Sequence, residues 1–146
     1  MKFDVYFAAP FFCDGEISIN NLLVSALEKH NLRVFYPFRD GFLAKDEIAG
    51  GIPDLDVMAK VWGNDTQAIR DSKVIVAVLD GRSVDEGVCV EVGYAAALEK
   101  PIVGFLSDDR KCFSWGLNPM LSFPLKSISA DVQVFVRSVL DASSNS

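Results

Sequence analysis

A glutamate interrupts an apolar helical pattern near the middle of the chain. In DEGVCVEVGYAAAL, residues 85–98, Glu91 follows Val88 by three residues and precedes Ala95 by four, so helical spacing places it on the apolar face. One interpretation is a helix-edge side chain whose stem packs while its carboxylate reaches water. The other is a carboxyl group that the fold keeps from water because a reaction uses it.

A second carboxylate repeats this pattern. Asp65 follows Trp62 by three residues and precedes Ile69 by four, on the apolar stripe of a helix expected from Leu55 to about residue 71. A helix cap explains Asp65 poorly because the helical pattern continues on both sides, although a wet groove at the helix edge would accommodate it. Two carboxylates on apolar faces favour a functional site over coincidence.

A third carboxylate, Asp85, opens the helix that carries Glu91. A carboxylate in a first turn is stabilised by the helix dipole in any protein, so its position alone does not indicate chemistry. Together, however, Asp85 and Glu91 supply what cleavage at an anomeric carbon uses, which is one ionised nucleophile and one group that carries a proton. Retaining chemistry needs the two about 5 Å apart. Burial and mutual repulsion would separate their pKa values and assign the roles.

The strands and helices that must position these carboxylates alternate along the chain. The unbroken apolar run at 73–80 is typical of a central parallel strand covered on both faces. The alternation predicts βαβ units, and hence an α/β fold with a flavodoxin-like or Rossmann-like doubly wound parallel sheet. We expect strands at 2–9, 32–36, 73–80, 101–106 and near 125–128, with helices at 17–29, 55–71, from 81 to about 100, and at 130–140. Ser18 is expected to cap the first helix, and a Ser83–Glu86 capping box to start the third.

The composition indicates one domain, residues 1–146, whose end from about 141 is a frayed tail. Half of the 146 residues are apolar, which is enough to form a core without disulfides or metals. The chain carries 14 Lys plus Arg against 20 Asp plus Glu, and no basic cluster lies beside aromatic residues. We therefore expect no nucleic acid polymer as a partner.

Cysteine usage and hydropathy predict a cytoplasmic protein. The three cysteines, Cys13, Cys89 and Cys112, are an odd number without zinc-site spacing and predict reduced thiols. A single histidine, His30, argues against a metal site rich in histidine. Asp4 interrupts the apolar N-terminal segment, which is typical of a strand rather than a signal peptide, and no other stretch approaches the about 20 apolar residues of a membrane span. We expect no membrane partner.

In doubly wound sheets, ligands bind beyond the carboxyl ends of the strands. This rule selects the loops AAPFFCDG and DGRSVDEG, after the first and central strands, and the loop after the second strand. No G-x-G-x-x-G or G-x-x-x-x-G-K-[ST] motif follows a strand, so the sequence predicts neither a dinucleotide nor a polyphosphate site.

Five motifs in this order resemble the nucleoside 2-deoxyribosyltransferases. They are VYFAAPFF, FYPFRDG, NDTQAIRDSKVIVAVLDG, DEGVCVEVGYAAALEKPIVG and NPM, and they extend from Phe3 to about Met120. The resemblance implies a flavodoxin-like fold and a homodimer or larger homo-oligomer. It further implies transfer of 2-deoxyribose between nucleobases, with deoxynucleosides and free bases as substrates and no cofactor.

The resemblance also implies roles for individual residues. Glu91 would be the nucleophile that forms the deoxyribosyl ester, and Asp85 the acid that protonates the departing base and later deprotonates the incoming one. Asp65 would bind the base, and Tyr6 would orient Glu91 by hydrogen bonding. Asn118 would reach a neighbouring subunit's site and bind the sugar's 5'-hydroxyl. From the residues alone, Tyr6 also fits a core strand, and Asn118 before proline fits an ordinary turn.

Five further residues are candidates for base binding. Phe11, Phe12 and Trp62 present flat rings that stack on any base, or they belong to an aromatic core. Arg39 and Asp40 touch the base, or they pair with each other in a turn.

Three alternative functions stay open. The related deoxynucleoside 5'-monophosphate N-glycosidases bind phosphate with a Gly- and Ser-rich first loop, whereas this loop is bulky and acidic, so Arg39 or Lys45 would have to supply the cation. A non-catalytic nucleoside-binding module would gain stability by losing buried carboxylates, which argues against it. A flavodoxin-like electron carrier lacks the Ser/Thr-rich phosphate loop for a flavin.

Overall fold

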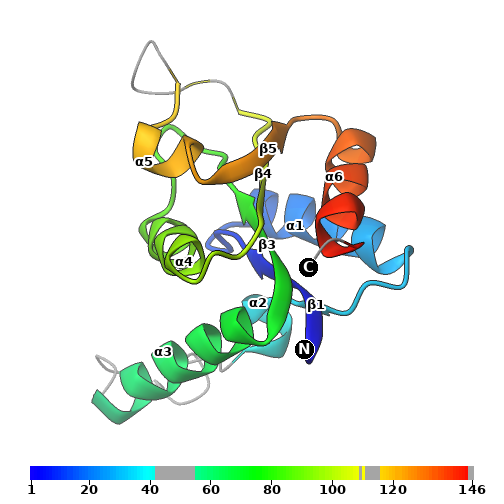
Figure 1. Ribbon diagram of the computed structural model, residues 1–146. Helices are drawn as coiled ribbons and strands as arrows, with labels where there is room; N and C mark the ends of the chain where they lie inside the picture. The colour runs from blue at the N-terminus through cyan, green and yellow to red at the C-terminus, as the bar shows by residue number, and fades with distance from the viewer. Residues whose placement is uncertain (42–54, 109, 111–115, 145–146) are drawn as a thin grey trace.

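A parallel sheet forms the centre of the protein in the computed structural model, which describes residues 1–41, 55–108, 110 and 116–144. Within these residues, five parallel strands pair in the order β2-β1-β3-β4-β5, the flavodoxin-like order (Figure 1). This confirms the fold class predicted from the sequence. The strands are β1 (Phe3–Ala8), β2 (Val34–Phe35), β3 (Ser72–Val78), β4 (Ile102–Phe105) and β5 (Leu125–Ser129). The helices are α1 (Asp14–Glu28), α2 (Pro37–Asp40), α3 (Leu55–Arg70), α4 (Glu86–Ala97), α5 (Pro119–Ser122) and α6 (Val132–Ser144).

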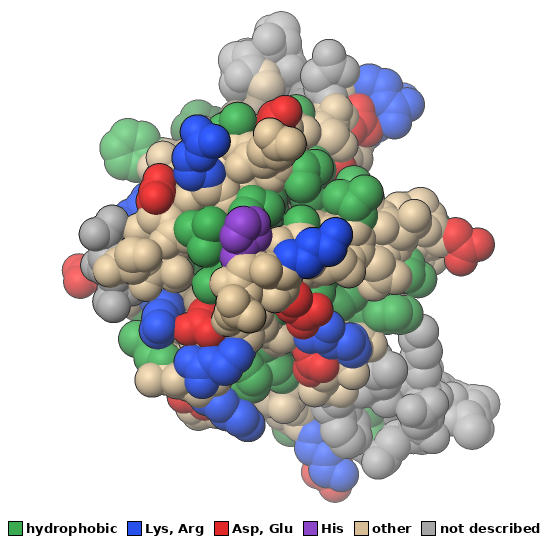
Figure 2. Space-filling model, turned by 90° about the vertical axis from the view of Figure 1, so that its right-hand side faces the viewer, with side chains coloured by type: hydrophobic (Ala, Val, Ile, Leu, Met, Phe, Trp, Pro, Cys, Tyr) green, Lys and Arg blue, Asp and Glu red, His purple; other side chains and the backbone are tan. Residues whose placement is uncertain are grey.

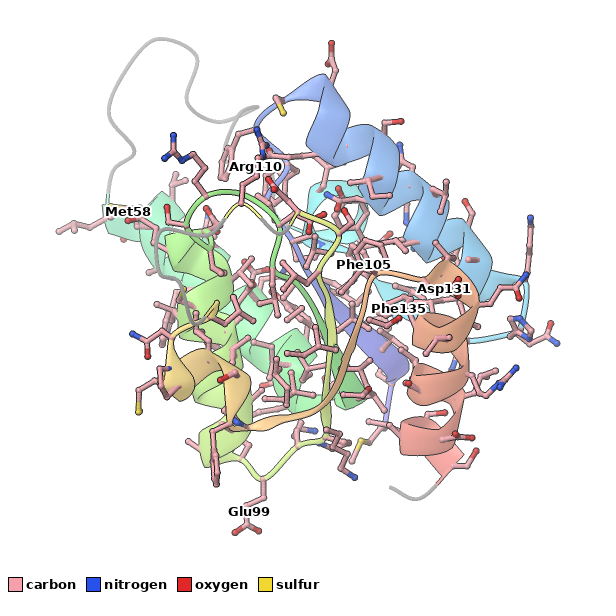
Figure 3. All side chains as sticks on the ribbon, turned by 90° about the horizontal axis from the view of Figure 1, so that it is seen from above. Met58, Glu99, Phe105, Arg110, Asp131 and Phe135 are labelled. Carbon is pink, nitrogen blue, oxygen red and sulfur yellow. The ribbon has the colours of Figure 1, made fainter. Side chains whose placement is uncertain are left out.

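Helices cover both faces of the sheet, and each face has its own apolar core. Helices α1 and α6 pack on one face, where Phe105 and Phe135 meet edge to face with ring centroids 5.4 Å apart (Figure 3). Helices α3 and α4 pack on the other face. Because successive side chains of a strand point to opposite faces, Phe7 faces the α1 and α6 layer while Tyr6 faces the α3 and α4 layer. Tyr6 therefore lies on the same side of the sheet as Glu91.

The outer surface over α1 and α6 is mixed in character. Figure 2 shows Lys, Arg, Asp and Glu side chains interspersed with apolar ones over this side of the molecule. Among the described residues, no helix has the length and apolar character that a membrane crossing requires.

Helix α1 begins earlier than the sequence predicted. It starts at Asp14 with Cys13 as N-cap, so the predicted cap at Ser18 is wrong. The carboxylate of Glu16 accepts hydrogen bonds from the backbone N–H groups of Phe12 (2.7 Å) and Cys13 (3.2 Å). These bonds satisfy donors that a helix start leaves unpaired, and so they extend the helix toward β1.

Two other helix ends differ from the prediction for similar local reasons. Helix α4 begins at Glu86 because Asp85 is its N-cap, with Oδ2 accepting from the Val88 N–H at 3.1 Å, so the predicted Ser83 capping box is wrong. Helix α6 continues through Ser144, where a frayed tail was expected, because Ala142 is buried in the core. Residues 145–146 lie outside the described residues.

Replacing Glu16 by alanine is expected to lower the free energy of unfolding by about 1 kcal/mol, because two backbone N–H groups lose their acceptor. Asp14→Ala removes a carboxylate from the same first turn and serves as the matched control for the helix dipole. Chemical denaturation of both variants measures the difference. If both variants lose the same free energy of unfolding, the hydrogen bonds of Glu16 add nothing to the effect of its charge.

Candidate active site

A phenol from the sheet meets a carboxylate from a helix at the centre of the site. The Tyr6 hydroxyl of β1 donates to Glu91 Oε1 of α4 at 2.5 Å. Tyr6 is fully buried, and Glu91 is partly buried on the helix face that Val88 and Val92 share. The apolar face of α4 accommodates a carboxyl group because a sheet residue supplies it with a strong donor.

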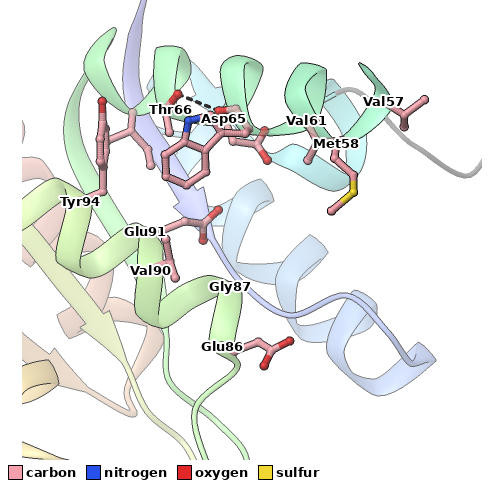
Figure 4. A pocket seen from close by; sticks show the side chains of 12 residues that line it. Val57, Met58, Val61, Asp65, Thr66, Glu86, Gly87, Val90, Glu91 and Tyr94 are labelled. Atoms are coloured by element: carbon pink, nitrogen blue, oxygen red, sulfur yellow. Dashed lines mark hydrogen bonds between the residues drawn. The ribbon is translucent and has the colours of Figure 1, made fainter. Parts of the chain in front are cut away.

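Glu91 opens into a cavity of about 870 Å³ between α3 and α4. Figure 4 shows Asp65 on α3 and Glu91 on α4 across this cavity. Apolar side chains form most of the wall, and Glu86 and Gly87 line the end near the start of α4. The apolar and aromatic lining residues are Val57, Met58, Val61, Trp62, Ile69, Val90 and Tyr94.

Burial and neighbouring charges make Glu91 a weak acid. Burial raises the pKa of Glu91 from 4.5 to about 8, the hydrogen bond from Tyr6 opposes this shift, and the charges of Asp65 and Asp85 add to it. Burial, followed by the charge of Glu91, raises the pKa of Tyr6 well above its ordinary range. Tyr6 therefore remains a donor at every pH at which Glu91 titrates.

Asp65 is the second weakened acid of the cavity. Burial raises the pKa of Asp65, while a hydrogen bond from the Asn64 amide to Oδ1, at 3.3 Å, works in the opposite direction. The charge of Asp65 also raises the pKa values of Tyr6 and Glu91, so Asp65 and Glu91 are electrostatically coupled.

Asp85 has both a structural position and an electrostatic effect. Its Oδ2 caps α4, as described above, and its charge raises the pKa of Glu91. A Cβ atom on Gly87 would lie 3.0 Å from Asp85 Oδ2, so glycine at position 87 leaves room for this carboxylate. The Tyr6 hydroxyl and the Glu91 carboxylate thus meet, Asp65 lines the same cavity, and the charge of Asp85 acts on Glu91. The roles that the family resemblance implies for these residues stay predictions.

The aromatic candidates divide between two places. Trp62 lines the cavity and meets Tyr94 edge to face, with ring centroids 6.2 Å apart. Phe11 and Phe12 stack on each other at 5.2 Å, and Phe11 packs against Phe38 at 5.5 Å, toward the core of the α1 and α6 layer. Only Trp62 of the three candidates lines the cavity beside Glu91.

The remaining candidates, Arg39, Asp40 and Asn118, do not line this cavity. Arg39 pairs with Asp40 and with Glu28, at 2.9 and 2.8 Å, so the turn interpretation describes the Arg39–Asp40 pair. Asn118 is exposed and caps α5, with Oδ1 accepting from the Met120 N–H at 2.9 Å. Lys45 and Cys112 lie outside the described residues.

Tyr94 lines the cavity, which the sequence did not predict. It lies three residues after Glu91, one helical turn along the same face, and this spacing was the available signal. The Arg70 guanidinium donates a hydrogen bond to the Tyr94 hydroxyl, which fixes the ring. Thr66, also missed, is buried and bonds to the Trp62 carbonyl at 2.7 Å.

Among the described residues, no group of His, Cys, Asp and Glu side chains is arranged to hold a metal ion. Cys13 and Cys89 are free thiols.

A flavodoxin-like sheet with a cluster of carboxyl groups beside an apolar cavity defines an α/β protein that acts on a small organic molecule. The chain belongs to the nucleoside 2-deoxyribosyltransferase family, because the family profile of that name matches residues 5–135. This family comprises enzymes that act on N-glycosidic bonds.

Individual relatives agree with this membership. A nucleoside deoxyribosyltransferase from Limosilactobacillus fermentum is 33% identical over 84 residues, which cover 56% of this chain and 49% of that protein. The match therefore spans about half the length of that relative. Two solved structures share the fold. A 2-deoxyribosyltransferase from Bacillus psychrosaccharolyticus has a TM-score of 0.74 at 21% identity, over 90% of this chain and 88% of that one. A CMP N-glycosidase from Clostridium botulinum has a TM-score of 0.57 at 19% identity, over 94% and 98% of the two chains.

Ionised Glu91 is expected to destabilise the folded protein. Because the folded state binds this proton more tightly than the unfolded chain, the free energy of unfolding should fall as pH rises from 4.5 to about 8. Each unit of raised pKa corresponds to about 1.4 kcal/mol. Glu91→Gln removes the titrating group, so its stability relative to wild type should increase across this pH range.

Thermal unfolding of both proteins between about pH 4 and about pH 9 tests this expectation. Glu86→Gln is the matched control, because this exposed glutamate lies on the same helix. Parallel stability curves for wild type and Glu91→Gln would contradict a weakened Glu91 acid.

Proposed function

We propose that this chain is a nucleoside 2-deoxyribosyltransferase that moves 2-deoxyribose between purine or pyrimidine bases, through a covalent glutamyl-deoxyribosyl intermediate and with retention. The observation that carries the proposal is the Tyr6–Glu91 hydrogen bond at the wall of a cavity that also contains Asp65. A carboxylate so placed serves as a nucleophile, and splitting one displacement into two steps preserves the configuration at the anomeric carbon.

In the first step, Glu91 attacks the anomeric carbon while the bond from that carbon to the base nitrogen breaks. Tyr6 holds Oε1, which leaves Oε2 as the attacking oxygen. Asp85 donates its proton to the departing base, since a neutral base is a poor leaving group. In the second step, Asp85 removes a proton from the incoming base, whose nitrogen displaces the glutamyl ester and restores the Glu91 carboxylate. No cofactor takes part.

Asp65 binds the base in this proposal. Its raised pKa allows the carboxyl group to carry a proton, so it can donate to a ring nitrogen or accept from an exocyclic amine. Trp62 supplies an aromatic wall in the same cavity, and exposed Phe12, in the loop after β1, supplies a second ring for the base. Phe11 packs toward the core instead.

The charges of the site favour a neutral nucleoside over a 5'-monophosphate. Among the described residues, those lining the cavity include three acids, Asp65, Glu86 and Glu91, and no Lys or Arg. In the first loop, Glu16 already occupies the backbone N–H groups of Phe12 and Cys13, which a phosphate would need. A nucleotide N-glycosidase is therefore the second candidate, supported by the shared fold of the Clostridium botulinum CMP N-glycosidase.

We further propose that the protein works in the cytoplasm as a homodimer or larger homo-oligomer, with Asn118 completing a neighbouring site. The short helix that Asn118 caps exposes Met120 (83%) and Phe123 (93%). Met58 and Trp62 are more than half exposed at the cavity, which leaves an apolar surface for a second copy to cover.

A chromatographic assay with 2'-deoxyinosine tests the reaction. Wild type should form 2'-deoxyadenosine only when free adenine is present, and Glu91→Ala should lower turnover at least about 10³-fold, because it removes the nucleophile. Glu99→Gln, an exposed change beyond the end of α4, should leave turnover unchanged.

Other products would identify a different function. Hypoxanthine released equally without adenine would indicate a hydrolase, and faster cleavage of 2'-deoxyinosine 5'-monophosphate would favour the nucleotide N-glycosidase. Binding of the nucleoside without turnover, tightened or unchanged in Glu91→Ala, would leave a non-catalytic binding module.

Mixing two inactive variants tests whether sites are shared between copies. Asn118→Ala and Glu91→Ala should each lack turnover, but reassembled hybrids contain one site with both residues intact. For random dimers mixed in equal amounts, about a quarter of wild-type activity should return. Light scattering on the same samples measures the oligomeric state. A monomer, or no recovery from verified hybrids, would contradict a shared site.

A further inference from the structure

One buried amide connects the chain after two neighbouring strands. Asn20 of α1 is fully buried, and its Nδ2 donates to the Pro10 carbonyl at 2.7 Å and to the Tyr36 hydroxyl at 3.0 Å. Pro10 lies two residues after β1, and Tyr36 directly follows β2. Both positions are at the carboxyl edge of the sheet, where α/β proteins bind their ligands.

Burial of this amide carries a cost in stability. Asn20 Oδ1 has no hydrogen-bond partner within the described part of the chain. An unpaired buried acceptor destabilises a fold, and a leucine would pack beside Leu23, Val24 and Leu27 on the same helix without this penalty. The two donated hydrogen bonds are therefore what asparagine supplies at this position.

The two connected loops also contact each other. The ring of Phe38, in α2, lies 5.5 Å from Phe11 and 5.7 Å from Tyr36. The Tyr36 N–H donates to Asp40 Oδ2 at 3.0 Å, which closes α2 into a compact turn. The loop after β1 and the turn after β2 thus form one unit, and Asn20 lies beneath it.

We propose that Asn20 is a positioning residue, whose buried amide holds the loop after β1 and the turn after β2 in the arrangement that binds the base. This inference rests on the proposed function, in which Phe12, with 75% of its surface exposed, contributes to base binding. Asn20 acts through these loops and has no contact with the reacting atoms. Loss of the Asn20 hydrogen bonds should weaken binding of the substrate and of the transition state equally. Such a change raises KM and leaves kcat unchanged.

Asn20→Leu tests the proposal by removing both donors. Its KM for 2'-deoxyinosine should rise about tenfold while kcat changes less than about threefold, and the pH dependence that Glu91 imposes should stay in place. Amide hydrogen exchange should accelerate in residues 11–13 and 36–41. The double variant Asn20→Leu/Tyr36→Phe, which leaves no hydroxyl unpaired, should keep the fold and show the same changes.

Ser72→Ala is the matched control for lost stability. Ser72 is fully buried and bonds to the Ala68 carbonyl at 2.8 Å, but it lies at the opposite, amino edge of the sheet. It should lower thermal stability without raising KM or loosening the two loops.

The proposal is wrong if Asn20→Leu folds and has the KM and the amide hydrogen exchange of wild type. It is also wrong if Asn20→Leu loses kcat while its KM stays constant, or if Ser72→Ala raises KM by the same factor. If wild type neither transfers nor hydrolyses, the proposed function fails by itself. The role of Asn20 is then decided by amide hydrogen exchange of the two loops and by calorimetric titration with free adenine. A weaker affinity for adenine and faster exchange in Asn20→Leu would still support a positioning role.

Discussion

The hydrogen bond between Tyr6 and Glu91 is the contact on which the rest of the site depends. It joins the first strand to the helix after the central strand, across an interface that is otherwise apolar. A carboxyl group there needs a donor, because an unpaired one would be too costly to bury. Tyr6 meets this need without supplying a positive charge, so Glu91 remains a weak acid rather than a stabilised anion. A lysine partner would have paired the charge and removed its reactivity.

The parallel sheet makes this contact possible. The strands β1 and β3 are adjacent and parallel, so their carboxyl ends meet at one edge of the sheet. Helix α4, which follows β3, also contacts β1, the strand that carries Tyr6. Asp65 approaches from α3, on the same face of the sheet. Three segments distant in sequence thereby meet at one site, where the carboxyl groups act on each other and on Tyr6.

Periodicity predicted the sheet, the helices and the two carboxylates on apolar faces, because burial leaves a direct record in the sequence. It failed at helix starts, where Glu16 and Asp85 act as acceptors through geometry that spacing does not specify. It could not place Phe11, whose position on the face opposite to the cavity depends on how a loop turns after proline. Periodicity also did not separate Tyr94 from the packing residues of its helix, because a helix face that packs can also line a cavity. The role of Asp85 came from the family resemblance rather than from its position.

The exposure of the cavity would connect the proposed chemistry to the proposed assembly. In the proposed reaction, a covalent deoxyribosyl ester would partition between an incoming base and water, and transfer would prevail only if the base pocket excludes water. In a single copy, Trp62 and Val90 are more than half exposed where they line the cavity. A second copy that covers this apolar surface would exclude water from the site and gain stability from the same burial. If the proposed oligomer forms over this surface, association would favour transfer of the sugar over hydrolysis of the proposed ester.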